Sequence, residues 1–195
     1  MCKGAFSRKG LLGLIAVALF LYTPLVALRI LYPLRFSAIV KEWAEERALD
    51  PALVAAVIRA ESRFRPDAVS PRNAIGLMQI TPMTGGWIAE QIGYTDFTTD
   101  LLFDPATNVE FGTWYLRHLL DRFSDIETVL QAYNAGPGKI EGWKEDPGAI
   151  YPATTLYVRR VVDSVWIYRL YFRLPFLARI TPLLGLSVAE RRSVG

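Results

Sequence analysis

The sequence predicts a mainly α-helical protein, because it contains three clear helix starts and no strand pattern. A capping residue is followed at once by proline at Asp50-Pro51, Thr81-Pro82 and Asp104-Pro105. Such a pair supplies an N-cap oxygen and places proline at the first helical position, where its missing N–H costs nothing. No segment alternates apolar and polar residues as a half-buried strand does. We therefore expect short helices joined by ordered loops.

The expected helices follow one another along the chain. They cover residues 36–49, 51–61, 82–93, 105–123, 126–133 and about 152–172. The helix over 51–61 carries Val54, Val57 and Ile58 at the spacing of a single helical face. The helix over 105–123 likewise places large apolar side chains on one face. Both helices should pack against a common core.

An uncharged, nearly apolar stretch lies at the N-terminus, from Gly10 to Leu28. As a helix it would be about 28 Å long at 1.5 Å per residue, close to the roughly 30 Å of a bilayer core. Lys3, Arg8 and Lys9 precede it, and no small-x-small cleavage site follows. We expect a single-pass transmembrane signal anchor over 10–31. Residues 1–9 would then be a basic cytoplasmic N-terminus, with the rest of the chain outside the cytoplasm, in the periplasm or facing the cell wall.

Composition limits what the remaining chain can be. At 195 residues, of which 52% are hydrophobic, the protein can hold one compact domain, here 36–172, with accessory segments. Its net charge of +3 is spread along the chain without a basic patch rich in aromatics, so nucleic acid is not an expected partner. Cys2 is the only cysteine, which excludes a disulfide within the chain. His118 is the only histidine and has no ligand cluster at metal-binding spacing, so neither a metal nor a cofactor is expected.

Glu61 is a carboxylate at a position where the helical pattern asks for an apolar residue. It extends the stripe of Val54, Val57 and Ile58 at the i+7 position. Loss of solvation and the negative end of the helix dipole would both raise its pKa, whereas the three neighbouring arginines would lower it. The residues alone leave two readings open. Glu61 is either an acid held half inside the protein or a last-turn glutamate that pairs outward with an arginine.

Two further segments carry polar groups suited to a sugar. Gly76-Leu77-Met78-Gln79 places a glutamine among apolar residues, and Ala132-Tyr133-Asn134-Ala135-Gly136 combines an aromatic ring with an amide. Each amide offers both a donor and an acceptor to hydroxyl and N-acetyl groups. Taken singly, each segment also has an ordinary explanation as a cap, a surface residue or core packing.

Together, Glu61-Ser62, the Gly76–Gln79 segment and the Ala132–Gly136 segment resemble, in this order, the signature of the soluble lytic transglycosylase family of peptidoglycan-cleaving enzymes. The resemblance covers about residues 36–162. The sequence from Glu61 to Ser70 and the Ile80-Thr81-Pro82 string support it. Asn108, with Gly112, Trp114 and Tyr115, supports it on the next helix.

This resemblance implies a lysozyme-like α domain that cleaves the β-1,4 bond between N-acetylmuramic acid and N-acetylglucosamine. Glu61 would be its single catalytic carboxyl group. It would first protonate the glycosidic oxygen and then take a proton from the muramic acid 6-hydroxyl. The product would be a 1,6-anhydromuramoyl end, so peptidoglycan strands would be the partner and cell-wall remodelling the setting.

The resemblance also implies substrate-binding roles for six further residues. Ser62 would hydrogen-bond near the Glu61 carboxyl or the substrate, and Met78 and Gln79 would line the groove. Tyr133, Asn134 and Tyr157 match the positions that surround the sugar at the cleaved bond. The chain departs from the family in having Ala153-Thr154 where Glu-Thr is common, which affects the support of Asn134.

Two other functions remain open at this stage. The protein could be a muramidase that uses water, or a catalytically weak wall-binding or scaffold protein, which Ala153 would favour. Trp143, in a stretch expected to be loop-rich, is a candidate for the groove. The basic and aromatic tail over 173–195 would either lie on the membrane surface or pack onto the domain.

Overall fold

The structure, a computed structural model, describes residues 8–174, and within them the fold is helical as expected. The α-helices are α1 (Arg8–Leu31), α2 (Ser37–Glu46), α3 (Pro51–Glu61), α4 (Pro82–Ile92), α5 (Pro105–Phe123), α6 (Ile126–Ala135), α7 (Ile140–Glu145) and α8 (Pro152–Arg173). Three short 3₁₀ helices, η1 (Thr99–Phe103), η2 (Pro137–Lys139) and η3 (Pro147–Ala149), lie between them. Among the described residues, β pairing is limited to two isolated bridges, which join Ile75 to Val69 and to Ile80.

The capping pairs seen in the sequence begin three of these helices. The Asp50 carboxylate accepts a hydrogen bond from Ala52 N (2.9 Å), and Asp104 accepts one from Thr107 N (2.8 Å). Thr81 caps α4 in the same way, through Thr84 N. Six of the expected helices are confirmed, with ends within a few residues of those predicted.

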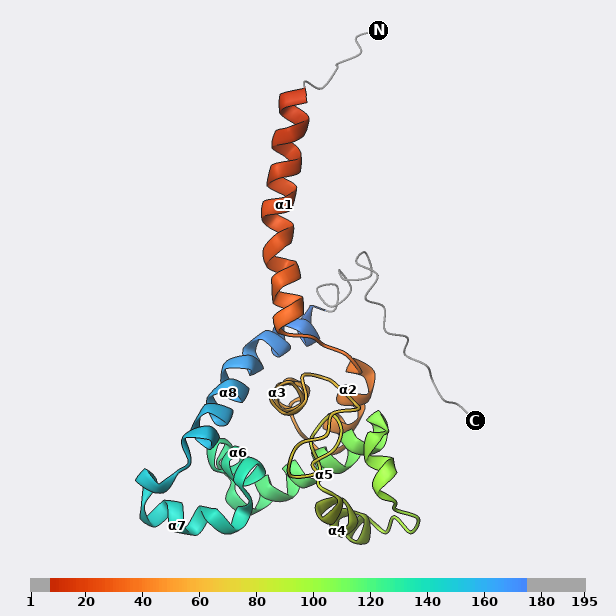
Figure 1. The fold of residues 1–195 in the computed structure, drawn as a ribbon, viewed down its shortest axis with the longest axis vertical. Coiled ribbons are helices and arrows are strands. Elements are labelled where there is room, and N and C mark those ends of the chain that lie inside the picture. The colour runs from red at the N-terminus through yellow and green to blue at the C-terminus, as the bar shows by residue number, and fades with distance from the viewer. Residues whose placement is uncertain (1–7, 175–195) are drawn as a thin grey trace.

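Helix α3 lies at the centre of the domain (Figure 1). It packs along α8 over a longer interface than any other pair of elements, and it also contacts α2. The side chains from Val54 to Ile58 are completely buried. Apolar side chains on all sides of a helix are stable only when the helix is enclosed, so the sequence of α3 agrees with its central place.

Helix α1 extends away from the domain, and its C-terminal end meets α8 (Figure 1). The Tyr168 hydroxyl of α8 donates a hydrogen bond to the Pro33 carbonyl (2.9 Å), which holds the segment that follows α1. Among residues 8–174, no helix has the length and apolar character required to cross a membrane. The structure thus shows the expected helix over 10–31 but not the transmembrane span.

The segment between α6 and α8 differs from the expectation. It was expected to be loop, but α7 and two 3₁₀ turns form there. Trp143 lies on α7, is only 6% exposed, and packs edge-on to Tyr151 at 5.3 Å between ring centroids. The prediction that Trp143 lines the groove is therefore wrong, because its ring is used to pack α7 against the domain.

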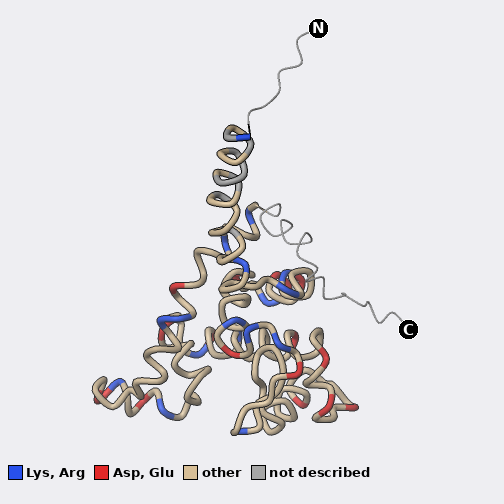
Figure 2. Tube along the Cα trace, turned by 45° about the horizontal axis from the view of Figure 1, so that its top comes forward, with Lys and Arg blue, Asp and Glu red and all other residues tan. Residues whose placement is uncertain are grey.

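The predicted tail over 173–195 falls outside the described residues from 175 onward. What precedes it belongs to the domain, since Tyr168 and Tyr171 of α8 are buried. Charged residues of both signs are distributed over the domain, whereas α1 has no charge between its two ends (Figure 2).

Candidate active site

Glu61 is the last residue of α3, and its carboxyl group is largely enclosed by the protein. Burial raises its pKa from 4.5 to about 7, because removal from water disfavours the charged form. Burial and the Tyr157 hydroxyl, rather than the neighbouring arginines, account for this shift in the pKa of Glu61. The reading in which Glu61 rotates outward to pair with an arginine is excluded, since none of the ion pairs among the described residues includes it.

Two tyrosines stand beside this carboxyl group. The Tyr157 hydroxyl, from α8, faces Glu61 and lowers its pKa by stabilising the carboxylate, an effect smaller than that of burial. The geometry is not that of a full hydrogen bond, since the buried Tyr157 hydroxyl has no hydrogen-bond partner among the described residues. Tyr133, from α6, donates its hydroxyl to the Met78 carbonyl at 2.8 Å.

Both tyrosines remain protonated at neutral pH. Burial and the nearby charge of Glu61 raise the pKa of Tyr133 and of Tyr157 well above 10. Each can therefore act only as a hydrogen-bond donor or a neutral acceptor beside the carboxyl group. The site thus has one titratable acid near neutrality, enclosed by neutral phenols.

Ser62 connects the end of α3 to the loop opposite. Its side chain is buried, and its hydroxyl lies 2.8 Å from the Leu77 carbonyl and 3.3 Å from the Ile58 carbonyl. In this structure Ser62 is therefore directed at the backbone. Directly after Ser62 the chain reverses through Arg63 and Phe64, both with positive φ, and the Phe64 ring is buried against Tyr168. This anchored turn fixes where α3 ends, and with it the position of Glu61.

Asn108 of α5 holds the loop that carries Met78. It is completely buried, accepts a hydrogen bond from Met78 N (2.7 Å), and donates to the carbonyls of Ile75 (2.9 Å) and Leu102 (2.7 Å). Gly76 is required at this contact. It has φ of +80°, and a Cβ there would lie 2.3 Å from both the Asn108 amide nitrogen and the Leu102 carbonyl oxygen.

Met78 and Gln79 differ in how much they expose to a groove. The Met78 side chain is fully buried, and a Cβ on Gly112 would lie 2.3 Å from its sulfur, so the two residues pack directly together. Met78 therefore reaches the site through its carbonyl, which holds Tyr133. Gln79 has φ of 52° and is partly exposed, with its amide nitrogen donating to Ala68 O (3.1 Å) and Gly76 O (3.0 Å).

Asn134 lies at the C-terminal end of α6 and is exposed. Its amide oxygen accepts a hydrogen bond from the hydroxyl of Thr154 at 2.9 Å. Thr154 is buried in the first turn of α8, next to the exposed Ala153. Although residue 153 is alanine here, Asn134 still has a side-chain partner on α8, namely Thr154, the residue that follows Ala153.

An aromatic cluster continues from Tyr133 toward the surface. Tyr133 contacts Tyr115 at 5.5 Å between centroids, and Tyr115 contacts Trp87 at 6.2 Å. His118 stacks on Trp114 at 5.3 Å with 7° between the ring planes, and its ring lies 5.2 Å from Trp87. His118 therefore packs as part of this cluster, whose Tyr115 ring contacts the Tyr133 ring.

The structure brings Glu61, Tyr133 and Tyr157 together and surrounds them with backbone held by Ser62, Gln79 and Asn108. The sequence reasoning gave no role to Asn108 or Thr154. The signal for Asn108 was present, because it lies three and seven residues before Phe111 and Tyr115, on the apolar face of α5. An amide on such a face is buried, and a buried amide needs partners. Nothing in the sequence indicated that Thr154 would reach Asn134.

Comparison with known proteins agrees with this geometry. Residues 38–151 match the family described as the transglycosylase SLT domain. The soluble lytic murein transglycosylase of Escherichia coli K12 is 28% identical over 151 residues, which are 73% of this chain and 23% of that protein. The membrane-bound lytic murein transglycosylase C of Actinobacillus pleuropneumoniae serotype 5b is 34% identical over 117 residues, 54% of this chain and 32% of that protein.

Solved structures show the same fold. An inactive mutant of the lytic transglycosylase Slt from Pseudomonas aeruginosa superposes with a TM-score of 0.71 at 29% identity, covering 75% of this chain and 26% of that one. The 70 kDa soluble lytic transglycosylase of Escherichia coli gives 0.67 at 27% identity, covering 72% and 25%. The chain thus spans about a quarter of the length of these soluble relatives. By its sequence match, its fold and the arrangement around Glu61, the chain belongs to the transglycosylase SLT domain family.

Proposed function

We propose that the protein is a peptidoglycan lytic transglycosylase and that Glu61 is its single catalytic acid and base. The observation that carries the proposal is the enclosure of the Glu61 carboxyl group at the end of α3, beside Tyr133 and Tyr157, which raises its pKa to about 7. A group that must donate a proton and then accept one works best when its pKa lies near the working pH. The relatives named as lytic murein transglycosylases support the reaction class, and the structural neighbour from Pseudomonas aeruginosa is an inactive mutant in which a glutamate is replaced by glutamine.

In the first step, protonated Glu61 donates its proton to the glycosidic oxygen between N-acetylmuramic acid and N-acetylglucosamine as the bond to the anomeric carbon breaks. In the second step, the Glu61 carboxylate removes the proton of the muramic acid 6-hydroxyl. The 6-oxygen then bonds to the anomeric carbon and closes the 1,6-anhydro ring. Glu61 ends protonated, and no water is consumed.

The surroundings of Glu61 support a mechanism with one carboxyl group. Glycosidases that use water employ two carboxyl groups, one on each side of the bond. Among the described residues no second carboxyl group contributes to the pKa of Glu61. Tyr157 would stabilise the carboxylate after the first step, and Asn134 and Gln79 would hold the sugar through the amide groups that they leave partly exposed.

The test is mass spectrometry of the fragments released from purified peptidoglycan by the wild type, Glu61→Gln and the control Glu90→Gln, an exposed glutamate of α4. We expect anhydro ends from the wild type and the control, and a loss of about 10²- to 10⁴-fold in Glu61→Gln. Ends heavier by one water would identify a muramidase. No release by the wild type, with glycan bound equally by Glu61→Gln, would identify the scaffold protein.

We also propose that α1 attaches the domain to a membrane, with the domain outside the cytoplasm. Large apolar side chains of α1, such as Leu19 and Phe20, are exposed, and no charge lies between its ends. We expect Leu19→Lys with Phe20→Lys to move the protein out of the membrane fraction after a carbonate wash. Leu156→Lys with Val162→Lys, exposed positions on α8, is the control and should not. A C-terminal alkaline phosphatase fusion, active only outside the cytoplasm, tests the orientation.

A further inference from the structure

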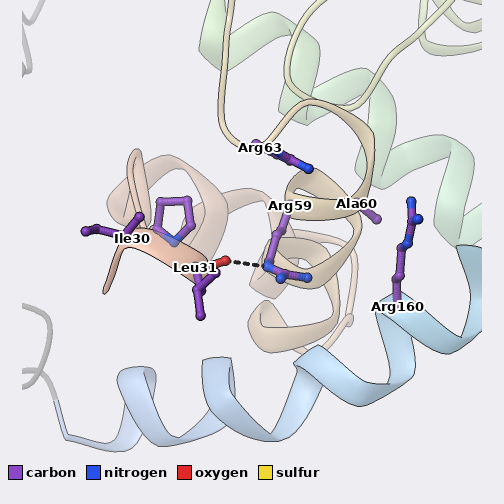
Figure 3. A pocket seen from close by; sticks show the side chains of 7 residues that line it. Ile30, Leu31, Arg59, Ala60, Arg63 and Arg160 are labelled. Atoms are coloured by element: carbon purple, nitrogen blue, oxygen red, sulfur yellow. Dashed lines mark hydrogen bonds between the residues drawn. The ribbon is translucent and has the colours of Figure 1, made fainter. Parts of the chain in front are cut away.

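A cavity of about 460 Å³ lies where α1 meets the domain, beside the last turn of α3, and neither Glu61 nor the two tyrosines next to it line this cavity. Ile30, Leu31 and Pro33 form its apolar side, and Arg59, Arg63 and Arg160 come from α3 and α8 (Figure 3). No acidic residue lines it. The cavity therefore combines three guanidinium groups with an apolar wall.

The three arginines have different tasks. Arg59 holds the end of α1, since its Nε donates to the Leu31 carbonyl at 2.8 Å and one terminal nitrogen donates to Ser164 Oγ at 3.0 Å. Its guanidinium carbon also lies 4.1 Å from the centroid of the Tyr32 ring. Arg63 and Arg160 are exposed, and neither forms an ion pair within the described part of the chain. Their charges are available to a ligand.

The chemistry of the cavity favours the phosphate of a lipid headgroup. A guanidinium group can donate two parallel hydrogen bonds to two oxygens of one phosphate, a geometry that an ammonium group cannot match. A free anion would gain nothing from the apolar side, whereas an anionic lipid can place its acyl chains beside Ile30 and Leu31, which are 69% and 59% exposed. The cavity opens at the base of α1, whose middle carries no charge, and this is the place that faces a membrane if α1 attaches the domain to one.

We propose that this cavity binds the phosphate of an anionic phospholipid through Arg63 and Arg160, and so sets the orientation of the domain on the membrane. The inference depends on the proposed membrane attachment by α1 but not on the reaction at Glu61. Arg59 supports the site by holding the end of α1 and is left intact in the test.

The test is native mass spectrometry of the full chain, released from detergent micelles that contain equal amounts of phosphatidylglycerol and phosphatidylcholine. We expect the wild type to retain phosphatidylglycerol preferentially. In Arg63→Gln with Arg160→Gln the affinity for phosphatidylglycerol should fall about thirtyfold. The control, Arg72→Gln with Arg122→Gln, removes the same charge from exposed positions that do not line the cavity and should keep the preference.

Three outcomes would overturn the proposal. They are no preference in the wild type, equal losses in the two double variants, or displacement of the lipid by millimolar inorganic phosphate, which would assign the site to a free anion. The lipid is supplied in micelles, so lipid binding to the cavity can be measured whether or not α1 attaches the protein to a membrane. The carbonate fractionation tests that attachment separately. Release of anhydro fragments by the double variant is recorded separately and reports on Glu61.

Discussion

The Tyr157 hydroxyl of α8 faces the Glu61 carboxyl at the end of α3, and the two residues set the acidity of the site in opposite senses. Enclosure of Glu61 raises its pKa to about 7, and Tyr157 limits that rise by stabilising the carboxylate. They are 96 positions apart in the chain and meet because α3 and α8 pack along each other.

Tyr157→Phe should therefore raise the pKa of Glu61 above 7. The alkaline limb of the activity profile should move to higher pH by at most about one pH unit, because a full hydrogen bond to a charged group is worth about 1.5 kcal/mol and this contact is weaker. The measurement is the release of anhydro fragments from pH 5 to pH 10. Tyr171→Phe, another buried tyrosine of α8 that does not act on Glu61, should leave the profile in place. An unchanged limb in Tyr157→Phe would show that the hydroxyl does not stabilise the carboxylate.

Glu61→Gln should change how stability depends on pH. In the wild type the folded state keeps the Glu61 proton up to about pH 7, whereas the unfolded chain loses it near pH 4.5. The folded state thus binds more protons between these values, so the free energy of unfolding falls as pH rises through this window and then levels off. Across the whole window the free energy of unfolding should fall by roughly 3 kcal/mol. Glu61→Gln lacks this loss and should be the more stable protein at pH 8.

Urea titrations at pH 4.5, 6 and 8 would measure this effect. Glu110→Gln is the control, because burial also raises the pKa of Glu110 but leaves that side chain more open to water. Most of the slope should persist in this control. Parallel stability curves for the wild type and Glu61→Gln would mean that the Glu61 carboxyl is not desolvated in solution.

Thr154→Val should weaken substrate binding more than folding. It removes the hydrogen bond to the Asn134 amide oxygen while keeping the shape of a buried side chain. We expect stability to fall by about 1 kcal/mol and KM for glycan fragments to rise, with kcat less affected. Thr155→Val, at the exposed neighbouring position, should change neither quantity. Equal KM values in the two variants would mean that Asn134 does not need Thr154.

Asn108→Ala should destabilise the whole domain. It leaves the Met78 N–H and the carbonyls of Ile75 and Leu102 without their buried partner, at a cost of about 3 kcal/mol. Thermal unfolding would show this as a large fall in Tm. Thr107→Ala, at the half-buried neighbouring residue, removes only a side-chain bond to Asp104 and should have a much smaller effect. A similar fall in Tm in the two variants would show that the hydrogen bonds of Asn108 do not stabilise the domain.

Local signals in the sequence were enough to predict the α-helices of the described residues except α7. The Asp50-Pro51 and Asp104-Pro105 pairs mark the starts of α3 and α5 because capping is decided by neighbouring residues. Helix α7 was missed, since six residues carry too little periodicity to distinguish helix from loop. Trp143 was misplaced for the same reason.

By itself the sequence determined that Glu61 ends an apolar helical face, and its motifs identified the family. Only the tertiary structure decided what surrounds that carboxyl group. The phenols of Tyr133 and Tyr157, the backbone held by Asn108, and the pairing of Thr154 with Asn134 depend on contacts between residues far apart in the chain. The acidity of Glu61 is set by desolvation and by these neighbours. Both are properties of packing, which no local stretch of sequence encodes.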